Sequence, residues 1–89
     1  MQVLLHPIPG KYLARLNEPD KSRIEEALEK LEHEPPEGNI RPIAGQAGYF
    51  RLKIGGYRIF FRHRDNDIFV THIDPRGQAY SKKNKGGKR

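Results

Sequence analysis

The segment that most constrains the fold covers residues 49–65 and reads YFRLKIGGYRIFFRHRD. Apolar and basic residues alternate on both sides of Gly55-Gly56, and a period of two residues is typical of a β-strand with one buried and one exposed face. Two consecutive glycines can adopt the positive φ angles that a two-residue hairpin turn requires. The sequence therefore predicts an antiparallel hairpin with one apolar face and one cationic face.

The same alternation assigns the side chains of this hairpin to its two faces. The expected apolar face contains Phe50, Leu52, Ile54, Ile59 and Phe61. The expected cationic face contains Arg51, Lys53, Arg58, Phe60, Arg62 and Arg64. Like charges this close together raise the free energy of the sheet unless an anionic partner lies across them. A solvated face that only keeps the protein soluble is the alternative, and the hairpin alone does not separate these two interpretations.

Two helices are predicted before the hairpin. Pro9 suits the first turn of a short helix, Pro19 opens a second helix, and Pro35-Pro36 ends it. The apolar positions of the second helix follow the spacing i, i+3, i+4 and i+7, and they are Ile24, Ala27, Leu28 and Leu31. This spacing is typical of a helix that packs along one side, so both helices are expected to cover one face of the sheet.

The remaining segments complete a predicted β-α-α-β-β-β order. Residues 1–5 form a short strand, residues 37–48 a loop, and residues 68–73 a last strand after the Asp65-Asn66 turn. This order indicates an α+β fold with a small antiparallel sheet and two N-terminal helices packed on one face. A chain of 89 residues can hold one domain, which we place at residues 1–80. Residues 81–89 contain no apolar side chain and predict a flexible basic tail.

Charge narrows the class of partner. The formal net charge is +6 and the pI is about 9.8, which favours a polyanionic partner, either nucleic acid or an acidic protein. There is no cysteine for a disulfide or a cysteine-based zinc site. No apolar run approaches the roughly 20 residues that cross a bilayer. We expect a soluble cytoplasmic protein without a membrane interaction.

The histidines do not indicate a metal or cofactor site. His63 is expected on the apolar face with Phe61, as a core or edge residue, whereas the face of His72 is ambiguous and leaves it a secondary candidate for the site. His6 and His33 show no ligand spacing, and carboxylates are scarce in the second half of the chain. We therefore expect no metal and no small-molecule cofactor.

The segment YFRLKIGGYRIFFR, together with Pro75, Arg76 and Tyr80, resembles the RelE/ParE superfamily of toxins from type II toxin–antitoxin systems. The resemblance covers nearly the whole chain and implies a RelE-like fold. RelE-like members cut messenger RNA on the ribosome, whereas ParE-like members poison DNA gyrase and lack the nuclease residues. The positions that match the RelE-like nuclease set are Arg51, Lys53, Arg58, Arg76 and Tyr80. This sequence departs from the RelE pattern by having Arg51 where lysine is common and Pro75 where histidine often precedes the arginine.

The resemblance therefore implies a metal-independent mRNA endonuclease that uses the 2′-hydroxyl of RNA as its nucleophile. Arg58 and Arg76 suit stabilisation of the phosphorane, and Lys53 and Tyr80 are both candidates for the general base. Further RNA-binding residues are expected to be Arg62, Arg64, Lys82 and Lys83. The implied partners are a cognate antitoxin and mRNA on the ribosome, including contacts to ribosomal RNA. The alternatives are a ParE-like gyrase inhibitor and a non-catalytic binding protein with the RelE fold.

Overall fold

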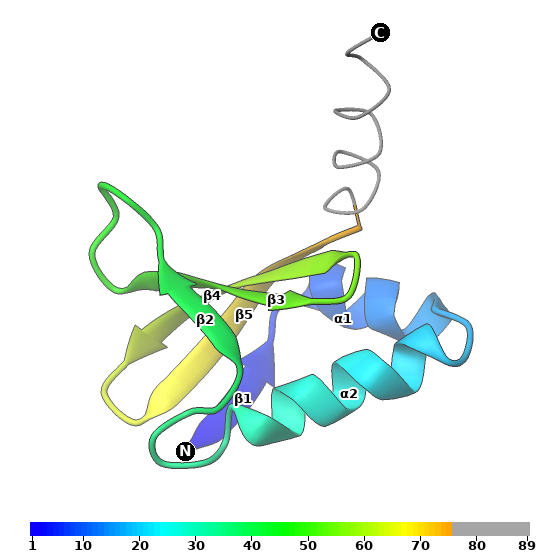
Figure 1. Ribbon diagram of the computed structural model, residues 1–89, viewed down its shortest axis with the longest axis horizontal. Helices are drawn as coiled ribbons and strands as arrows, with labels where there is room; N and C mark the ends of the chain where they lie inside the picture. Colours follow the sequence, from blue (N-terminus) through cyan, green and yellow to red (C-terminus); the bar gives the residue numbers. More distant parts are fainter. Residues whose placement is uncertain (76–89) are drawn as a thin grey trace, which may run out of the picture.

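The computed structural model describes residues 1–75 as two helices and a five-stranded mixed sheet (Figure 1). The elements in chain order are β1 (Gln2–Leu5), α1 (Pro7–Arg15), α2 (Asp20–Lys30), β2 (Asn39–Pro42), β3 (Tyr49–Ile54), β4 (Tyr57–Arg64) and β5 (Asp67–Asp74). The strands lie in the order β1-β5-β4-β3-β2. The α+β class, both helices and the β3–β4 hairpin agree with the sequence predictions. The predicted boundary at residue 80 and the predicted tail lie outside the described residues.

Two features of the sheet differ from the predictions. The segment expected to be a loop contains β2, which pairs antiparallel with β3 from Asn39↔Lys53 to Pro42↔Phe50. Its four residues NIRP are too few for alternation to indicate a strand, and they end in Pro42, which is typical of loops and strand edges. In addition, β1 pairs parallel with β5, because the two helices carry the chain across the sheet before β2 begins.

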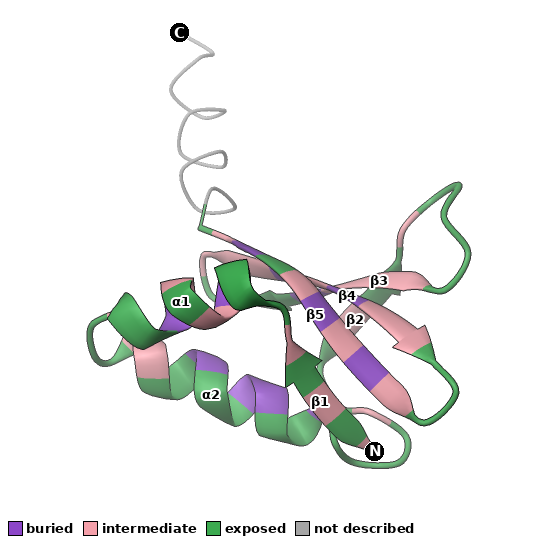
Figure 2. Cartoon of the chain, turned by 180° about the vertical axis from the view of Figure 1, so that it is seen from behind, coloured by how far each residue is buried: buried purple, intermediate pink, exposed green. Residues whose placement is uncertain are grey.

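The core lies between the helices and one face of the sheet. Figure 2 shows buried residues recurring along β5 and on the inner side of α2. The buried side chains of the helices are Pro9, Leu13, Ile24, Ala27 and Leu28, and those of the sheet are Leu52, Ile59, Phe61, Ile68, Val70 and Ile73. Phe61, Ile24 and Ile59 are almost fully removed from solvent. Burial of this apolar surface is the main term that fixes which face of the hairpin points inward.

A bulge in β5 changes the direction of the side chains near its end. Phe60 pairs with His72, whereas the next residue, Phe61, pairs with Val70, so Thr71 is the additional residue. The Thr71 hydroxyl donates a hydrogen bond to the Phe60 carbonyl over 3.3 Å. Because one residue is inserted, Val70 and Ile73 are both buried although they are three positions apart. His72 consequently lies on the outer face, a point that simple alternation left open.

The tip of the hairpin is tied to α2 by one side-chain hydrogen bond. The hydroxyl of Tyr57, the first residue of β4, donates to the Asp20 carboxylate over 2.7 Å. This hydrogen bond, assisted by burial and by the negative charge of Asp20, raises the pKa of Tyr57 to about 12.

Within the described residues, neither helix has the length and apolar character of a membrane span.

Candidate nucleic-acid interface

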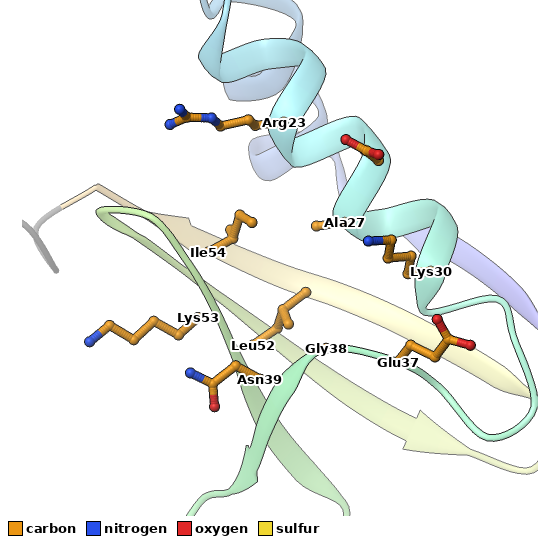
Figure 3. Close-up of a pocket in the computed structure, with 10 residues that line it drawn as sticks. Arg23, Ala27, Lys30, Glu37, Gly38, Asn39, Leu52, Lys53 and Ile54 are labelled. Atoms are coloured by element: carbon orange, nitrogen blue, oxygen red, sulfur yellow. The ribbon is translucent and has the colours of Figure 1, made fainter.

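The cationic side chains of the hairpin lie on the face of the sheet that points away from the helices, here called the outer face. Lys53 on β3 is paired with Arg58 on β4, and Arg51 is paired with Phe60. Figure 3 shows Leu52 and Ile54 directed toward α2, whereas the Lys53 side chain points away from it. Lys53 is exposed, and Arg51 and Arg58 are half-buried. The structure therefore brings these three predicted site residues together on adjacent positions of two strands.

The register extends this arrangement across four strands. Paired residues share a face, so one row of the outer face contains Asn39, Lys53, Arg58 and Asp74. The next row contains Arg41, Arg51, Phe60 and His72. Within this second row, Arg41 on β2 is paired directly with Arg51 on β3. Sequence reasoning missed the contribution of Asn39 and Arg41 because it placed them in a loop.

Arg58 has an unusual environment for a cation. Its Nε atom is buried and has no hydrogen-bond partner within residues 1–75. A buried donor without a partner raises the free energy of the folded state by about 1–3 kcal/mol. The guanidinium also offers further donors in a planar fork that matches phosphate geometry. The guanidinium of Arg58 is thus suited to an anionic ligand such as a phosphate on the outer face.

The two other described arginines of the predicted set lie further along β4. The Arg62 guanidinium carbon lies 5.6 Å from the centre of the Tyr49 ring, within the range of a cation–π interaction. Arg62 is half-buried, and Arg64 is exposed at the end of the strand. Arg62 pairs with Tyr49 on one side and with Phe69 on the other, so aromatic rings flank this cation on both neighbouring strands.

Four predicted residues cannot be located. Arg76, Tyr80, Lys82 and Lys83 lie outside the described residues, so their predicted roles remain untested. The last strand ends at Asp74, which pairs with Arg58. Arg76 comes two residues after Asp74 in the sequence, and Asp74 is adjacent to Arg58 in the sheet.

The two histidines of the sheet lie on opposite faces. His63 faces the helix side, where its ring makes an edge contact with Phe50 at a centroid distance of 6.5 Å. This agrees with the prediction for His63. His72 is exposed on the outer face, with its ring centroid 5.9 Å from that of Phe60. The sequence analysis left His72 as a secondary site candidate. The bulge at Thr71 places it on the same face as the cationic residues.

Two hollows formed by residues 1–75 lie on the helix side of the sheet or at its edge. One, of about 210 Å³, separates α2 from β3 and has Arg23, Lys30 and Glu37 on its lining (Figure 3). A more open one, of about 360 Å³, is lined by apolar groups and His63. Residues 1–75 contain no cluster of three or more potential histidine or carboxylate metal ligands. On the outer face, Lys53 and His72 are exposed to solvent, an arrangement that can bind an extended polymer.

A family model described as the ParE toxin of the type II toxin-antitoxin system, parDE, matches residues 10–80. The chain belongs to this ParE toxin family. It is a toxin of the RelE/ParE superfamily, as the sequence resemblance predicted. A search of curated proteins gave no significant match.

Two solved structures resemble this ParE-family toxin along most of its length. A chain of the RelB-RelE antitoxin-toxin complex from Methanococcus jannaschii is 21% identical, with a TM-score of 0.70 over 89% of this chain and 96% of that chain. A chain of the archaeal RelE-RelB complex from Pyrococcus horikoshii OT3 is 26% identical, with a TM-score of 0.70 over 86% of this chain and 96% of that chain. These similarities confirm the RelE-like fold.

Proposed function

We propose that this toxin is a ribosome-dependent mRNA endonuclease that cleaves RNA without a metal ion. The observation that carries the proposal is the direct pairing of Lys53 with Arg58 on the outer face, next to Arg51. Three cationic groups on adjacent sheet positions can bind a phosphate and stabilise negative charge that develops on it. The planar fork of donors on the Arg58 guanidinium also suits an anionic ligand at the same position.

The proposed reaction uses a nucleophile that RNA itself supplies. The 2′-oxygen forms a bond to the adjacent phosphorus as its proton is removed, and the bond from phosphorus to the 5′-oxygen breaks as that oxygen gains a proton. The products are a 2′,3′-cyclic phosphate and a 5′-hydroxyl. Arg58 and Arg76 stabilise the phosphorane, Lys53 or Tyr80 accepts the 2′-hydroxyl proton, and Arg76 is a candidate proton donor.

The remaining cations extend the proposed RNA path. Arg62 and Arg64 continue along β4 from Arg58, and Lys82 and Lys83 belong to the basic C-terminal segment. We assign these four residues to contacts with mRNA and ribosomal RNA. Their contribution is electrostatic and therefore weakens as salt concentration rises. Translation occurs in the cytoplasm, which is the proposed location of the toxin.

A cognate antitoxin is the proposed protein partner. The two similar solved structures are antitoxin–toxin complexes, and the family is defined by such systems. An acidic antitoxin segment would complement the cationic outer face and compete with RNA for it. Inhibition would then follow from neutralisation of the residues that bind the scissile phosphate.

Inhibition of DNA gyrase is a second candidate function, because the matching family model is that of the ParE toxin. A non-catalytic member of the fold is the third. Induced expression followed by primer extension on translated mRNA and by plasmid supercoiling analysis separates them. Endonuclease activity predicts new 5′ ends within codons that disappear with Arg58→Ala. Accumulated gyrase–DNA breaks without mRNA cleavage would support the gyrase function instead. The absence of both mRNA cleavage and gyrase–DNA breaks would support the non-catalytic function.

A further inference from the structure

An aromatic pair lies in the middle of the outer face. Phe60 on β4 and His72 on β5 occupy paired positions, and their ring planes are inclined by 53° at a centroid distance of 5.9 Å. Phe60 is half-buried and His72 is exposed. A large apolar ring on the solvent side of a sheet gains nothing from the core, which lies on the opposite face.

Cationic residues surround Phe60 on the other sides. Arg51 is its partner on β3, and Arg58 and Arg62 precede and follow it by two positions on β4, so all three share its face. The nearest carboxylate position on the outer face is Asp74, which pairs with Arg58 rather than with Phe60. Phe60 therefore has a histidine at the paired position on one side and arginine positions on the other three.

This combination matches the repeating chemistry of a single-stranded nucleic acid. Each nucleotide offers a flat base for stacking and a phosphate for a cation, and proteins bind single strands by combining aromatic rings with a positively charged surface. With a rise of about 3.4 Å per residue, the backbones of Arg58 and Arg62 are separated by about 14 Å, with Phe60 midway. A base on Phe60 would thus have arginines available for phosphates on both sides.

We propose that Phe60 and His72 form a stacking site that holds one unpaired RNA base beside the phosphate-binding cations. The inference rests on the proposed endonuclease function for the identity of the ligand as RNA. The site positions the strand, so its residues contribute to binding and to the choice of cleavage position rather than to proton transfer. Phe60 supplies the half-buried ring and His72 the exposed one.

The test measures binding of a fluorescent single-stranded oligoribonucleotide that carries 2′-O-methyl groups and so cannot be cleaved. A second set of oligonucleotides has one base removed at each position in turn. We expect wild-type protein to lose affinity about tenfold at one abasic position. Phe60→Leu should lose a similar amount with the intact strand and nothing further at that abasic position, whereas Phe60→Tyr should bind like wild type. Ile8→Ala, which shortens a 77% exposed side chain of α1, is the matched control and should not change affinity.

Equal affinity of folded Phe60→Leu and wild type for every oligonucleotide would overturn the stacking site. If Phe60→Leu does not fold, His72→Ala is tested instead, because the exposed side chain of His72 can be removed without opening the core. An RNA affinity of His72→Ala equal to that of wild type would then overturn the proposal. A wild type that binds no RNA would also overturn it and favour a protein partner for this face. A wild type that binds RNA with the expected Phe60 dependence but does not cut translated mRNA would support the stacking site while refuting the proposed nuclease.

Discussion

Lys53 and Arg58 lie directly opposite each other on the outer face of the β3–β4 hairpin. Like charges at paired positions of neighbouring strands destabilise a sheet by up to about 1 kcal/mol. Asp74 pairs with Arg58 on its other side, but the like-charge pairing still sets some local stability against the positive charge that the proposed reaction needs. Such a conflict between stability and activity is common at functional sites.

Neutralising one member of this pair should separate stability from function. We expect Lys53→Gln to leave the free energy of unfolding unchanged or to raise it by up to about 0.5 kcal/mol, measured by urea denaturation at low salt. The same variant should lose toxicity to growing cells. Lys30→Gln, on α2, is a matched control and should remain toxic. A Lys53→Gln protein that is clearly destabilised would show that Lys53 has a structural role on the sheet.

The tip of the hairpin should depend on the hydrogen bond between Tyr57 and Asp20. Tyr57→Phe removes a hydrogen bond to a carboxylate at a partly exposed position, so we expect a loss of about 1 kcal/mol in the free energy of unfolding. Asp20→Ala, which removes the acceptor, should cost a similar amount. The double variant should cost less than the sum of the two single variants, because both remove the same interaction. Full additivity of the two losses would contradict this contact.

The same hydrogen bond predicts a dependence of stability on alkaline pH. The pKa of Tyr57 rises from about 10 in the unfolded chain to about 12 in the folded protein. The folded state therefore favours the protonated phenol, and its contribution is complete below pH 10 and lost as pH rises toward 12. The stability difference between wild type and Tyr57→Phe should shrink across this interval. A difference that grows with pH would have the wrong sign.

The chemical step should not require a divalent cation. Arginine and lysine side chains can supply the charge that a metal would otherwise provide to the phosphorane. Addition of a chelator to toxin and a preassembled, stabilised ribosome–mRNA complex should leave the single-turnover cleavage rate unchanged. An untreated complex tested for ribosome integrity is the control. Loss of cleavage that is restored by Mn²⁺ or Zn²⁺ alone would contradict the arginine mechanism.

Removal of residues 82–89 should affect binding more than catalysis. The segment KKNKGGKR contains five basic residues and two glycines, a composition that supports electrostatic attraction rather than a fixed geometry. The truncated protein should show a shallower dependence of RNA affinity on salt, and its cleavage rate at saturation should stay near that of the full chain. A large fall in the saturated rate would place this segment within the active site.

Alternation predicted the hairpin because one of its faces is buried. Leu52, Ile59 and Phe61 must all reach the core, and this requirement fixes the outward direction of Lys53 and Arg58. The same signal is too weak in β2, which has four residues and none fully buried, because an edge strand needs few buried side chains.

Polar and apolar alternation did not predict the face of the sheet on which His72 lies, for a different reason. The additional residue Thr71 reverses the faces within β5, and a bulge has no reliable signature in a polar and apolar pattern. The aromatic pair with Phe60 depends on that reversal. The proposed stacking site therefore emerges only from the register of the strands, whereas the Lys53–Arg58 pair is implied by the hairpin sequence.

The most direct test of the proposed nuclease is single-turnover cleavage of mRNA in a purified, preassembled ribosome complex, with wild type compared with Arg58→Ala. Arg58→Ala removes donors from the transition-state charge, so we predict a rate at least about 10²-fold lower at saturating toxin. Arg23→Ala, which removes a 61% exposed arginine from α2, should cleave at the wild-type rate. Equal rates for folded Arg58→Ala and wild type, or a wild type that leaves the mRNA intact, would contradict the account.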